Sequence, residues 1–422
     1  MISNRVLGVI GSGTMGEGIA QCGAVAGYKV LTFDVKPELV IQANAKIAER
    51  LDGAVAKGKM SKLERDQAVA RLHVGKSYDE LKDAEVVIEA APEELALKKK
   101  IFAELDRVCS AKVLRGTNTS SLSIATIAEG LKHADRLLGI HFFNPAPVMK
   151  LIELVQGPAT SDQTMVEGRA VAAFLAKTPV KVKDSPGFIG NRVNRPFYLQ
   201  ALHLLEKGEA DIRTIDAAVK SIGGFKMGPF ELLDLIGLDI NLSVTQSVYE
   251  GFNKPDRFRP SSIQQKLVES GHLGRKSGRG FYDHTNGNPA PAFESPLRDA
   301  SSWKPSKALT DFAAALGKPA DRAMWLYARI IVAVINEGGL TADTIALPRD
   351  VDVTMELGFN YPQGPLGLAD FVGLPIVQKL MADFHTESGQ SECYRANALL
   401  DRLVADGKWG EQSAKGFLYH AL

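Results

Sequence analysis

A histidine and a glutamate in the segment 117–153 stand where together they could move a proton. His141 ends a β-like run, and Glu153 lies twelve residues later in the next apolar run, MKLIELV. Asn144 and Pro145 break the first run, so a return of the chain would bring the carboxylate back to the imidazole. The carboxylate would orient the ring and stabilise its cationic form while the ring takes a hydroxyl proton and hydride leaves the carbon. The pair therefore predicts oxidation of an alcohol.

A glycine-rich loop near the start predicts the hydride acceptor. GSGTMG (11–16) follows a strand-like run and opens a helix, within the strand–turn–helix–strand context that dinucleotide binding requires. Gly11 permits a tight turn, Gly13 lets a pyrophosphate approach, and Gly16 lets the helix pack on the strand. Asp34 ends the next strand, where its carboxylate can accept from both ribose hydroxyls and would repel a 2′-phosphate. This favours NAD over NADP, unless Asp34 only opens a turn.

The segment 1–184 alternates strand-like and helical stretches. The strand-like runs are apolar, rich in β-branched residues and mostly bounded by Gly, Asp or Pro. They cover 6–10, 29–33, 84–90, 112–118, 136–142 and 179–184, and the intervening helical segments include 15–26, 37–57 and 93–109. Such alternation predicts an α/β, Rossmann-type doubly wound, mainly parallel sheet. His141 then lies at the carboxyl edge, where such sheets place their sites.

Beyond Asp184 the sequence reads as helical and contains a duplication. A helix is expected over 185–208, and the segment 215–283 aligns on 351–419 without a gap, identical at 16 of 69 positions. Several of these identities are Gly and Pro, which carry backbone geometry rather than hydrophobicity alone. We expect two tandem all-α domains after the sheet domain. The expected divisions are 1–184, 185–283, a linker at 284–318, and a degenerate second copy at 319–422.

Composition excludes several classes of protein. The 50 Lys and Arg against 49 Asp and Glu leave a net charge of +1, which argues against nucleic-acid or membrane-surface binding. No uninterrupted apolar stretch approaches the ~20 residues of a membrane helix, and the start reads as a strand rather than a signal peptide. Three widely spaced cysteines predict neither a disulfide framework nor a metal site. We expect a reduced, cytoplasmic protein.

The chain resembles the 3-hydroxyacyl-CoA dehydrogenases over about residues 1–283. GSGTMG, NTSSLSI, HFFNPAPVMKLIELV, DSPGFIGNRV, GFKMGPFELLDLIGLD and LGRKSGRGFYD stand at the family's spacing. The resemblance implies an acyl-CoA thioester as substrate, His141 as general base and Glu153 as its partner. It also implies that Ser120 and Asn191 hydrogen-bond the substrate's hydroxyl and thioester region.

The resemblance further implies a set of cofactor contacts and one contact to coenzyme A. The glycine-rich loop would carry the pyrophosphate of NAD, Asp34 the adenosine ribose, and a group of polar residues would surround the nicotinamide half. Lys57 is the nearest match for a residue that meets the 3′-phosphate of coenzyme A. The implied cofactor residues are Gly11, Ser12, Gly13, Thr14, Met15, Gly16, Asp34, Glu93, Lys98, Ser120, Asn144 and Lys276.

Several of these residues have a purely structural alternative. Ser120 or its neighbour Ser121 could cap the following helix. Asn191 could be a solvated helix position, Lys276 a surface loop charge, and Lys57 part of a solvated basic turn.

Within the family, the chain resembles longer bacterial members with a second helical domain, some of which act on 3-hydroxyadipyl-CoA in phenylacetate breakdown. Those are usually longer between the helical copies than this chain. The second copy has Gln412 where the first has Lys276, and Ala328 where it has Asn191. We therefore expect the copy to be catalytically silent and to replace a dimer partner in cis, leaving a monomer or self-assembly through another face.

Two competing functions use the same fold. One is a dehydrogenase of small free hydroxy or sugar acids, and the other is a non-catalytic nucleotide sensor or structural relative. The pattern HFFNPAPVMK argues against the first, and the set Ser120, His141, Glu153 and Asn191 argues against the second.

Overall fold

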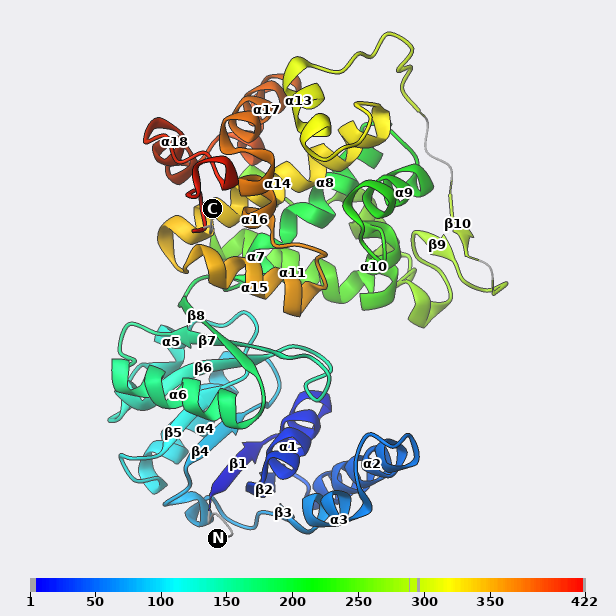
Figure 1. Cartoon of the computed structure of the whole chain (residues 1–422). Coiled ribbons are helices and arrows are strands. Elements are labelled where there is room, and N and C mark those ends of the chain that lie inside the picture. The colour runs from blue at the N-terminus through cyan, green and yellow to red at the C-terminus, as the bar shows by residue number, and fades with distance from the viewer. Residues whose placement is uncertain (1–4, 288, 294–296, 420–422) are drawn as a thin grey trace. The chain divides into compact units, whose positions relative to one another are not determined.

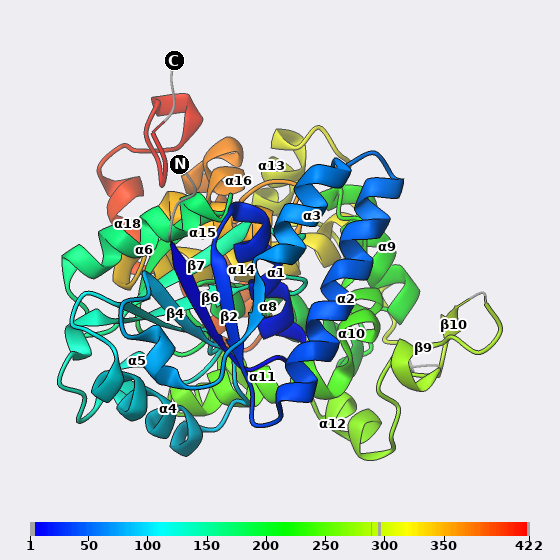
Figure 2. The same ribbon diagram turned by 90° about the horizontal axis from the view of Figure 1, so that it is seen from below.

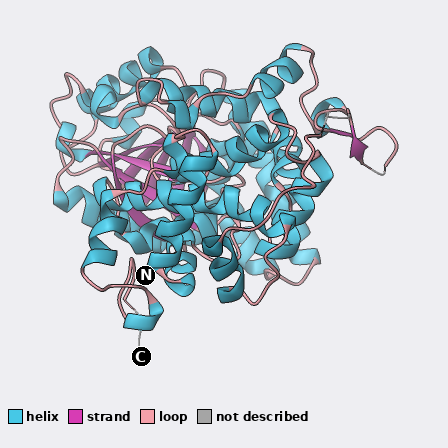
Figure 3. Ribbon diagram, turned by 90° about the horizontal axis from the view of Figure 1, so that it is seen from above, coloured by secondary structure: helices cyan, strands magenta, loops and turns pink. Residues whose placement is uncertain are grey.

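The computed structural model describes residues 5–287, 289–293 and 297–419. The chain forms two compact units, Met1–Phe188 and Ile189–Leu422. Figure 3 shows that the strands gather in the first unit, while the second is built almost entirely from helices.

The first unit is organised around one eight-stranded sheet with the order β3-β2-β1-β4-β5-β6-β7-β8. Neighbouring strands are parallel except β6 and β7, which pair antiparallel. The strands are β1 (Val6–Ile10), β2 (Lys29–Phe33), β3 (Leu72–Val74), β4 (Val86–Glu89), β5 (Leu114–Thr117), β6 (Leu137–Phe142), β7 (Leu151–Gln156) and β8 (Thr178–Lys183). The mainly parallel, doubly wound sheet predicted from the sequence is confirmed.

Helices cover the sheet because its central strands are apolar along their length. One core cluster joins Leu7 and Val9 of β1 to Ile19 of α1, Ile47 of α2 and Met165 of α6. Helix α5 packs on β6 and on α4. In the view of Figure 2, α1, α2 and α3 lie near β1 and β2. These helices are α1 (Thr14–Ala26), α2 (Pro37–Ala56), α3 (Lys62–Ala70), α4 (Leu95–Val108), α5 (Ile124–Ala128) and α6 (Asp162–Phe174), with short 3-10 helices η1 (Tyr78–Leu81) and η2 (Ala134–Arg136).

The second unit is an assembly of short helices around a long one (Figure 1). Helix α14 packs against α8, α9 and α16. The helices are α7 (Gly190–Val193), α8 (Arg195–Glu206), α9 (Ile212–Gly223), α10 (Pro229–Ile236), α11 (Leu238–Gly251), α12 (Ser262–Glu269), α13 (Lys307–Ala315), α14 (Arg322–Thr344), α15 (Pro348–Phe359), α16 (Pro365–Val372), α17 (Leu374–Glu387) and α18 (Ala398–Ala405). Between them lie η3 (Asp256–Phe258), η4 (Arg275–Ser277), η5 (Glu392–Tyr394), η6 (Glu411–Ser413) and the paired strands β9 (Tyr282–Asp283) and β10 (Ala290–Pro291).

The single helix expected over 185–208 is wrong in two respects. Residues 186–189 form a turn, and the helix is divided at Asn194 into α7 and α8. Pro196 lacks the N–H that a continuous helix would bond at that position, which accounts for the division. Helix α13 lies in the last part of the stretch assigned to the linker, 284–318, and its Leu309 and Phe312 are buried; it agrees with the helical composition of the chain from about residue 308.

The aligned segments of the helical unit share unusual local geometry. Asp234 accepts hydrogen bonds from the backbone of Phe281 and Tyr282 at 2.8 and 2.9 Å. Asp370, the aligned position in the second copy, accepts them from Phe417 and Leu418, both at 2.8 Å. Because buried carboxylates with two backbone donors are demanding to build, their recurrence at one offset supports a duplicated domain.

Helix α14 is long and apolar enough to cross a membrane by length and composition, with a mean hydropathy of 1.2 in its best window. Within the structure 89% of that window is buried against other helices. It is therefore the central core helix of the second unit.

Candidate active site

The structure places His141 and Glu153 directly opposite each other on the antiparallel strands β6 and β7. The imidazole Nδ1 and the carboxylate Oε2 lie 2.7 Å apart. Both residues are buried, and Glu153 is fully buried. The antiparallel pairing of β6 and β7 is the return of the chain that the sequence predicts. Its register places both side chains on the same face of the sheet.

The orientation of the His141 ring defines which nitrogen is available for chemistry. When Nδ1–H donates to Glu153, the lone pair of the neutral ring is on Nε2, and a general base needs that lone pair. The ring also lies against two phenylalanines, with centroids 4.9 Å from Phe143 and 5.8 Å from Phe188. Packing and the carboxylate together restrict the ring to one orientation.

The side chain of Asn118 supports the strand that carries His141. Its Oδ1 accepts a hydrogen bond from the backbone N–H of Phe142 at 2.9 Å. Asn118 lies just beyond β5, so this contact joins the carboxyl ends of two neighbouring strands beside the histidine. This role was not predicted from the sequence, although the position of Asn118 after a buried strand was a usable signal.

At each of the three glycines of the first loop, a side chain would either clash with the backbone or project into the open space beside the loop. Gly11 has φ +101°, and a Cβ there would lie 2.5 Å from the carbonyl oxygen of Ala90. A Cβ at Gly16 would lie 1.9 Å from the carbonyl oxygen of Gly11. At Gly13, by contrast, a Cβ would meet nothing within 4 Å. The loop is therefore closed behind Gly11 and Gly16 and open at Gly13, where a pyrophosphate would approach the start of α1.

Asp34 lies beside this loop at the end of β2. Its Oδ2 accepts hydrogen bonds from the N–H of Ser12 at 2.8 Å and from its hydroxyl at 2.6 Å. Thr14 and Met15 begin α1 and line the same cavity as Asp34, which has a volume of about 1400 Å³. The residues present fit a dinucleotide, with a fixed carboxylate for ribose hydroxyls and open backbone for phosphates.

Glu93 organises the loop that follows β5. Its Oε1 accepts hydrogen bonds from the Thr119 hydroxyl at 2.6 Å and from the N–H groups of Ser120 and Ser121 at 2.9 and 3.2 Å. Burial alone would raise the pKa of Glu93, but these donors and the Lys98 ammonium hold that pKa below its usual value. An ionised Glu93 thus anchors the segment that contains Ser120.

Lys98 is held inside the protein rather than presented to solvent. Its side chain is 1% exposed, and its Nζ lies 2.7 Å from Oε1 of Glu89 and 3.3 Å from Oε2 of Glu93. Glu89 also accepts from the Thr117 hydroxyl at 2.7 Å. Sequence reasoning missed Glu89, although a glutamate inside the apolar run EVVIEA was a signal of a buried ionic network.

The helix cap after this loop is neither Ser120 nor Ser121. Ser123 caps α5, because its side chain accepts from the N–H of Thr126. The hydroxyl of Ser123 in turn donates to Asp184 at 2.8 Å. Ser120 and Ser121 are therefore bound to Glu93 and are not used in capping.

The remaining residues implied by the resemblance lie apart from these contacts. Asn144 is exposed after β6, and Lys57 is exposed at the end of α2 and does not line the nucleotide cavity. Asn191 and Lys276 belong to the helical unit, where Asn191 lies on α7 and Lys276 forms an ion pair with Asp239 at 2.6 Å. Among the described residues no group of three or more His, Cys, Asp or Glu could hold a metal ion.

Comparison with protein families gives matches along nearly the whole chain. The family model of the NAD-binding domain of 3-hydroxyacyl-CoA dehydrogenase matches residues 6–185. The model of the C-terminal domain of 3-hydroxyacyl-CoA dehydrogenase matches residues 187–284 and again residues 325–420.

Three individual relatives are between 35% and 41% identical to this chain. A 3-hydroxyadipyl-CoA dehydrogenase of Escherichia coli (strain K12) is 36% identical over 463 residues, which cover 95% of this chain and 97% of the relative. A crystal structure of 3-hydroxybutyryl-CoA dehydrogenase from Escherichia coli K12 has a TM-score of 0.86 and 35% identity, covering 96% of this chain and 99% of that one. The structure of (S)-3-hydroxybutyryl-CoA dehydrogenase from Ralstonia eutropha, with a TM-score of 0.65 and 41% identity, covers 67% of this chain and 100% of that one.

Proposed function

Since the chain belongs to the 3-hydroxyacyl-CoA dehydrogenase family and is an NAD-dependent enzyme, we propose that it interconverts (S)-3-hydroxyacyl-CoA and 3-oxoacyl-CoA with His141 as the general base. The observation that carries the proposal is the buried contact of 2.7 Å between His141 Nδ1 and Glu153. A ring so oriented can take the hydroxyl proton at Nε2.

Glu153 has two tasks in this proposal. It selects the tautomer with the proton on Nδ1, and it stabilises the imidazolium that forms when Nε2 takes the substrate's proton. Because Glu153 is fully buried, its charge acts on the ring with little screening by water. In the reductive direction the same imidazolium returns the proton to the nascent alcohol.

NAD, when bound, accepts the hydride that leaves the substrate carbon. The open backbone at Gly13 and the start of α1 would bind its pyrophosphate, and Asp34 would bind its adenosine ribose. Ser120 would hydrogen-bond the reacting oxygen from a loop that Glu93 holds in place. Asn191, Asn144, Lys276 and Lys57 stay proposed contacts on the strength of the resemblance alone.

The duplicated helical domain supports a proposal about assembly. Its second copy has Gln412 in place of Lys276, and no equivalent of the Lys276–Asp239 ion pair, because Pro375 aligns with Asp239. We infer that the second copy has no catalytic role and covers in cis the face that a partner subunit would otherwise cover. The three cysteines are buried and free, in keeping with a proposed reducing, cytoplasmic location.

The test is oxidation of NADH by the full-length protein with acetoacetyl-CoA, with free acetoacetate at the same concentration as control. We expect turnover with the thioester and little with the free acid. Turnover of the free acid alone would identify a dehydrogenase of free hydroxy acids, and silence with both would favour a non-catalytic protein.

The length and polarity of the acyl chain form a separate question. One methylene contributes only about 1–3 kcal/mol of discrimination, so the preference depends on details of side-chain packing. Values of kcat/KM for 3-hydroxyacyl-CoA substrates from C4 to C16, with the dicarboxylic C6 thioester included, would distinguish a fatty-acid or butanoate enzyme from one acting on 3-hydroxyadipyl-CoA.

A further inference from the structure

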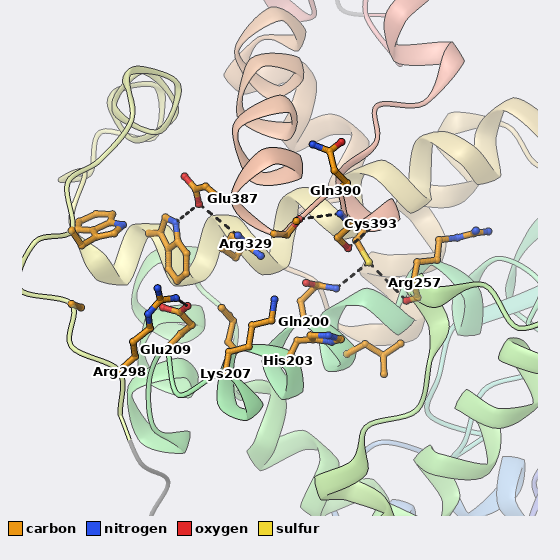
Figure 4. A pocket seen from close by; sticks show the side chains of 18 of the residues that line it. Gln200, His203, Lys207, Glu209, Arg257, Arg298, Arg329, Glu387, Gln390 and Cys393 are labelled. Atoms are coloured by element: carbon orange, nitrogen blue, oxygen red, sulfur yellow. Dashed lines mark hydrogen bonds and ion pairs between the residues drawn. The ribbon is translucent and has the colours of Figure 1, made fainter.

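A second cavity lies entirely within the helical unit and shares no lining residue with the nucleotide cavity of the first unit. It has a volume of about 740 Å³, which is in the range of small-molecule sites. Its walls come from α8 and residues 256–259 of the first copy, from residues 298–304, and from α14 and residues 387–395 of the second copy. Figure 4 shows Lys207 extending from the end of α8 toward the side that carries Arg329.

The lining of this cavity carries an excess of cations, although one of them, Arg257, is also paired at 3.0 Å with the buried Glu337, which lies outside the lining. It contains eight Arg and Lys residues against five Asp and Glu residues. The cations are Lys207, Arg257, Arg259, Arg298, Lys304, Arg322, Arg329 and Arg395. Burial lowers the pKa of His203, which also lines the cavity, so this imidazole adds hydrogen-bonding capacity rather than charge at neutral pH.

The carboxylates of the lining already have partners. Glu209 binds Arg322, Asp256 lies 3.3 Å from Arg259, and Glu387 lies 3.6 Å from Arg329. Glu392 lies 3.9 Å from Arg257, and Asp299 accepts hydrogen bonds from Ser301. Lys207, Lys304 and Arg395 have no ion pair among the residues that the structure describes, and all three are exposed. Clustered like charges repel one another, so a bound anion would relieve this repulsion.

The two helical copies differ in how an equivalent pair of arginines, Arg192 and Arg329, is neutralised. In the first copy Arg192 is neutralised by Glu337 at 2.6 Å and covered by the ring of Phe252, 4.9 Å away. Arg329 is its equivalent in the second copy. At the offset that relates these two arginines, Gln200 corresponds to Glu337, and in the gapless alignment of the copies Ser388 corresponds to Phe252. Arg329 is itself buried beneath the rings of Trp325, Phe384 and Tyr394, but its carboxylate partner Glu387 is exposed, so the second copy lacks the buried counter-charge of the first.

One wall of the cavity is held rigid by aromatic contacts. The guanidinium of Arg322 lies 3.8 Å from the ring centre of Trp325 and 5.5 Å from that of Trp303. The buried Nε of Arg322 has no hydrogen-bond partner among the described residues. The aromatic contacts thus fix the guanidinium of Arg322 at the cavity wall.

We propose that this cavity binds a diphosphate group, as carried by nucleotides or by inorganic pyrophosphate. A diphosphate carries more negative charge and more oxygens than a smaller anion, so it can neutralise more of the excess positive charge of the lining, and guanidinium groups bind phosphate oxygens in pairs. A monovalent anion would leave most of the excess charge unmatched. The site goes beyond the proposed dehydrogenase reaction and does not depend on it.

Binding can be measured on the full-length protein through its own tryptophans. All three, Trp303, Trp325 and Trp409, belong to the helical unit, and two of them line the cavity. With the protein free of NAD, which itself carries a diphosphate, ADP and pyrophosphate should each change the fluorescence in a saturable way, and inorganic phosphate should bind at least about tenfold more weakly. ADP tighter than pyrophosphate would identify a nucleotide site, and equal affinities would identify a site for any diphosphate.

Matched variants locate the binding. Lys207→Gln, Lys304→Gln and Arg395→Gln combined should weaken diphosphate binding by about tenfold or more, which corresponds to about 1.4 kcal/mol or more, because the three positive charges of the lining without an ion pair among the described residues are removed. The control combines Lys226→Gln, Lys318→Gln and Lys379→Gln, which remove the same charge from exposed positions outside the cavity. NADH oxidation with acetoacetyl-CoA should be unchanged in both. No saturable binding by the wild-type protein, or equal weakening in both variants, would overturn the proposal.

Discussion

At the scale of single residues, the carboxylate behind His141 should matter as much as the imidazole itself. Glu153→Gln keeps the size of the side chain but removes the charge that stabilises the imidazolium and selects the tautomer. We expect kcat to fall by about 10²–10⁴-fold with the affinity for NAD nearly unchanged. Steady-state kinetics with 3-hydroxybutyryl-CoA, together with NAD titration, would measure both. A variant with kcat near that of the wild type would show that the pair is structural.

Glu89 should act as a positioning residue through Lys98. Glu89→Gln leaves a buried ammonium with Glu93 as its remaining anionic partner, which should pull Glu93 away from Ser120 and Ser121. We expect a loss of about 3–5 kcal/mol in unfolding free energy and a raised KM for NAD.

The double variant Glu89→Gln with Lys98→Met separates structure from positioning. Removing both charges should recover most of the stability, because no uncompensated buried charge is left. Catalysis should stay impaired, since Glu93 would still lack the ammonium beside it. Full recovery of both stability and KM would mean that the network only supports the fold.

At the scale of elements, the buried aspartates of the helical copies should determine stability independently of the reaction. Asp370→Ala removes the acceptor for two backbone N–H groups, and each unsatisfied buried donor costs about 1–3 kcal/mol. We expect a clearly lowered midpoint of urea unfolding with kcat unchanged below the transition. Asp406→Ala, at an exposed position, is the control and should have little effect. A large loss of kcat in folded Asp370→Ala would contradict the silent second copy.

The elements that the sequence predicts well are those whose signals are local. The strands 6–10 and 29–33 are predicted with their observed bounds, because apolar runs meet Gly and Asp at their ends. The strand β3 was missed because a short run around an exposed histidine carries no periodic signal. The division at Asn194 was missed although Pro196 was a local signal for it, because the helical spacing of the apolar residues continues across it.

In the candidate site, too, the features with local sequence signals were predicted and those that depend on packing were not. His141 and Glu153 could be paired from the sequence because two short apolar runs around a break predict an antiparallel return. The network of Glu89 and Lys98 could not, because a buried ion pair between a strand and a helix depends on how the helix packs. The cationic cavity was also beyond prediction, since its walls come from segments that lie far apart in the sequence.

At the scale of the whole molecule, the second helical copy should replace a partner subunit. Helix α14 packs against α8 and α9, so deletion of 307–422 would expose the apolar face that those helices present to it. We expect the truncated protein to dimerise or aggregate in light scattering and to unfold at a lower temperature. A truncated protein that stays monomeric, stable and fully active would rule out this role of the copy.

The central claim, that His141 is the base of a dehydrogenase acting on CoA thioesters, is tested most directly by one comparison of His141→Gln with the wild type. The measurement is kcat for oxidation of 3-hydroxybutyryl-CoA by NAD, with the dissociation constant of NADH measured on both proteins. We predict a loss of several orders of magnitude in kcat with NADH binding unchanged, because the base acts in the transition state and hardly in cofactor binding. A His141→Gln variant that binds NADH normally and retains kcat within a few-fold of the wild type would contradict the account.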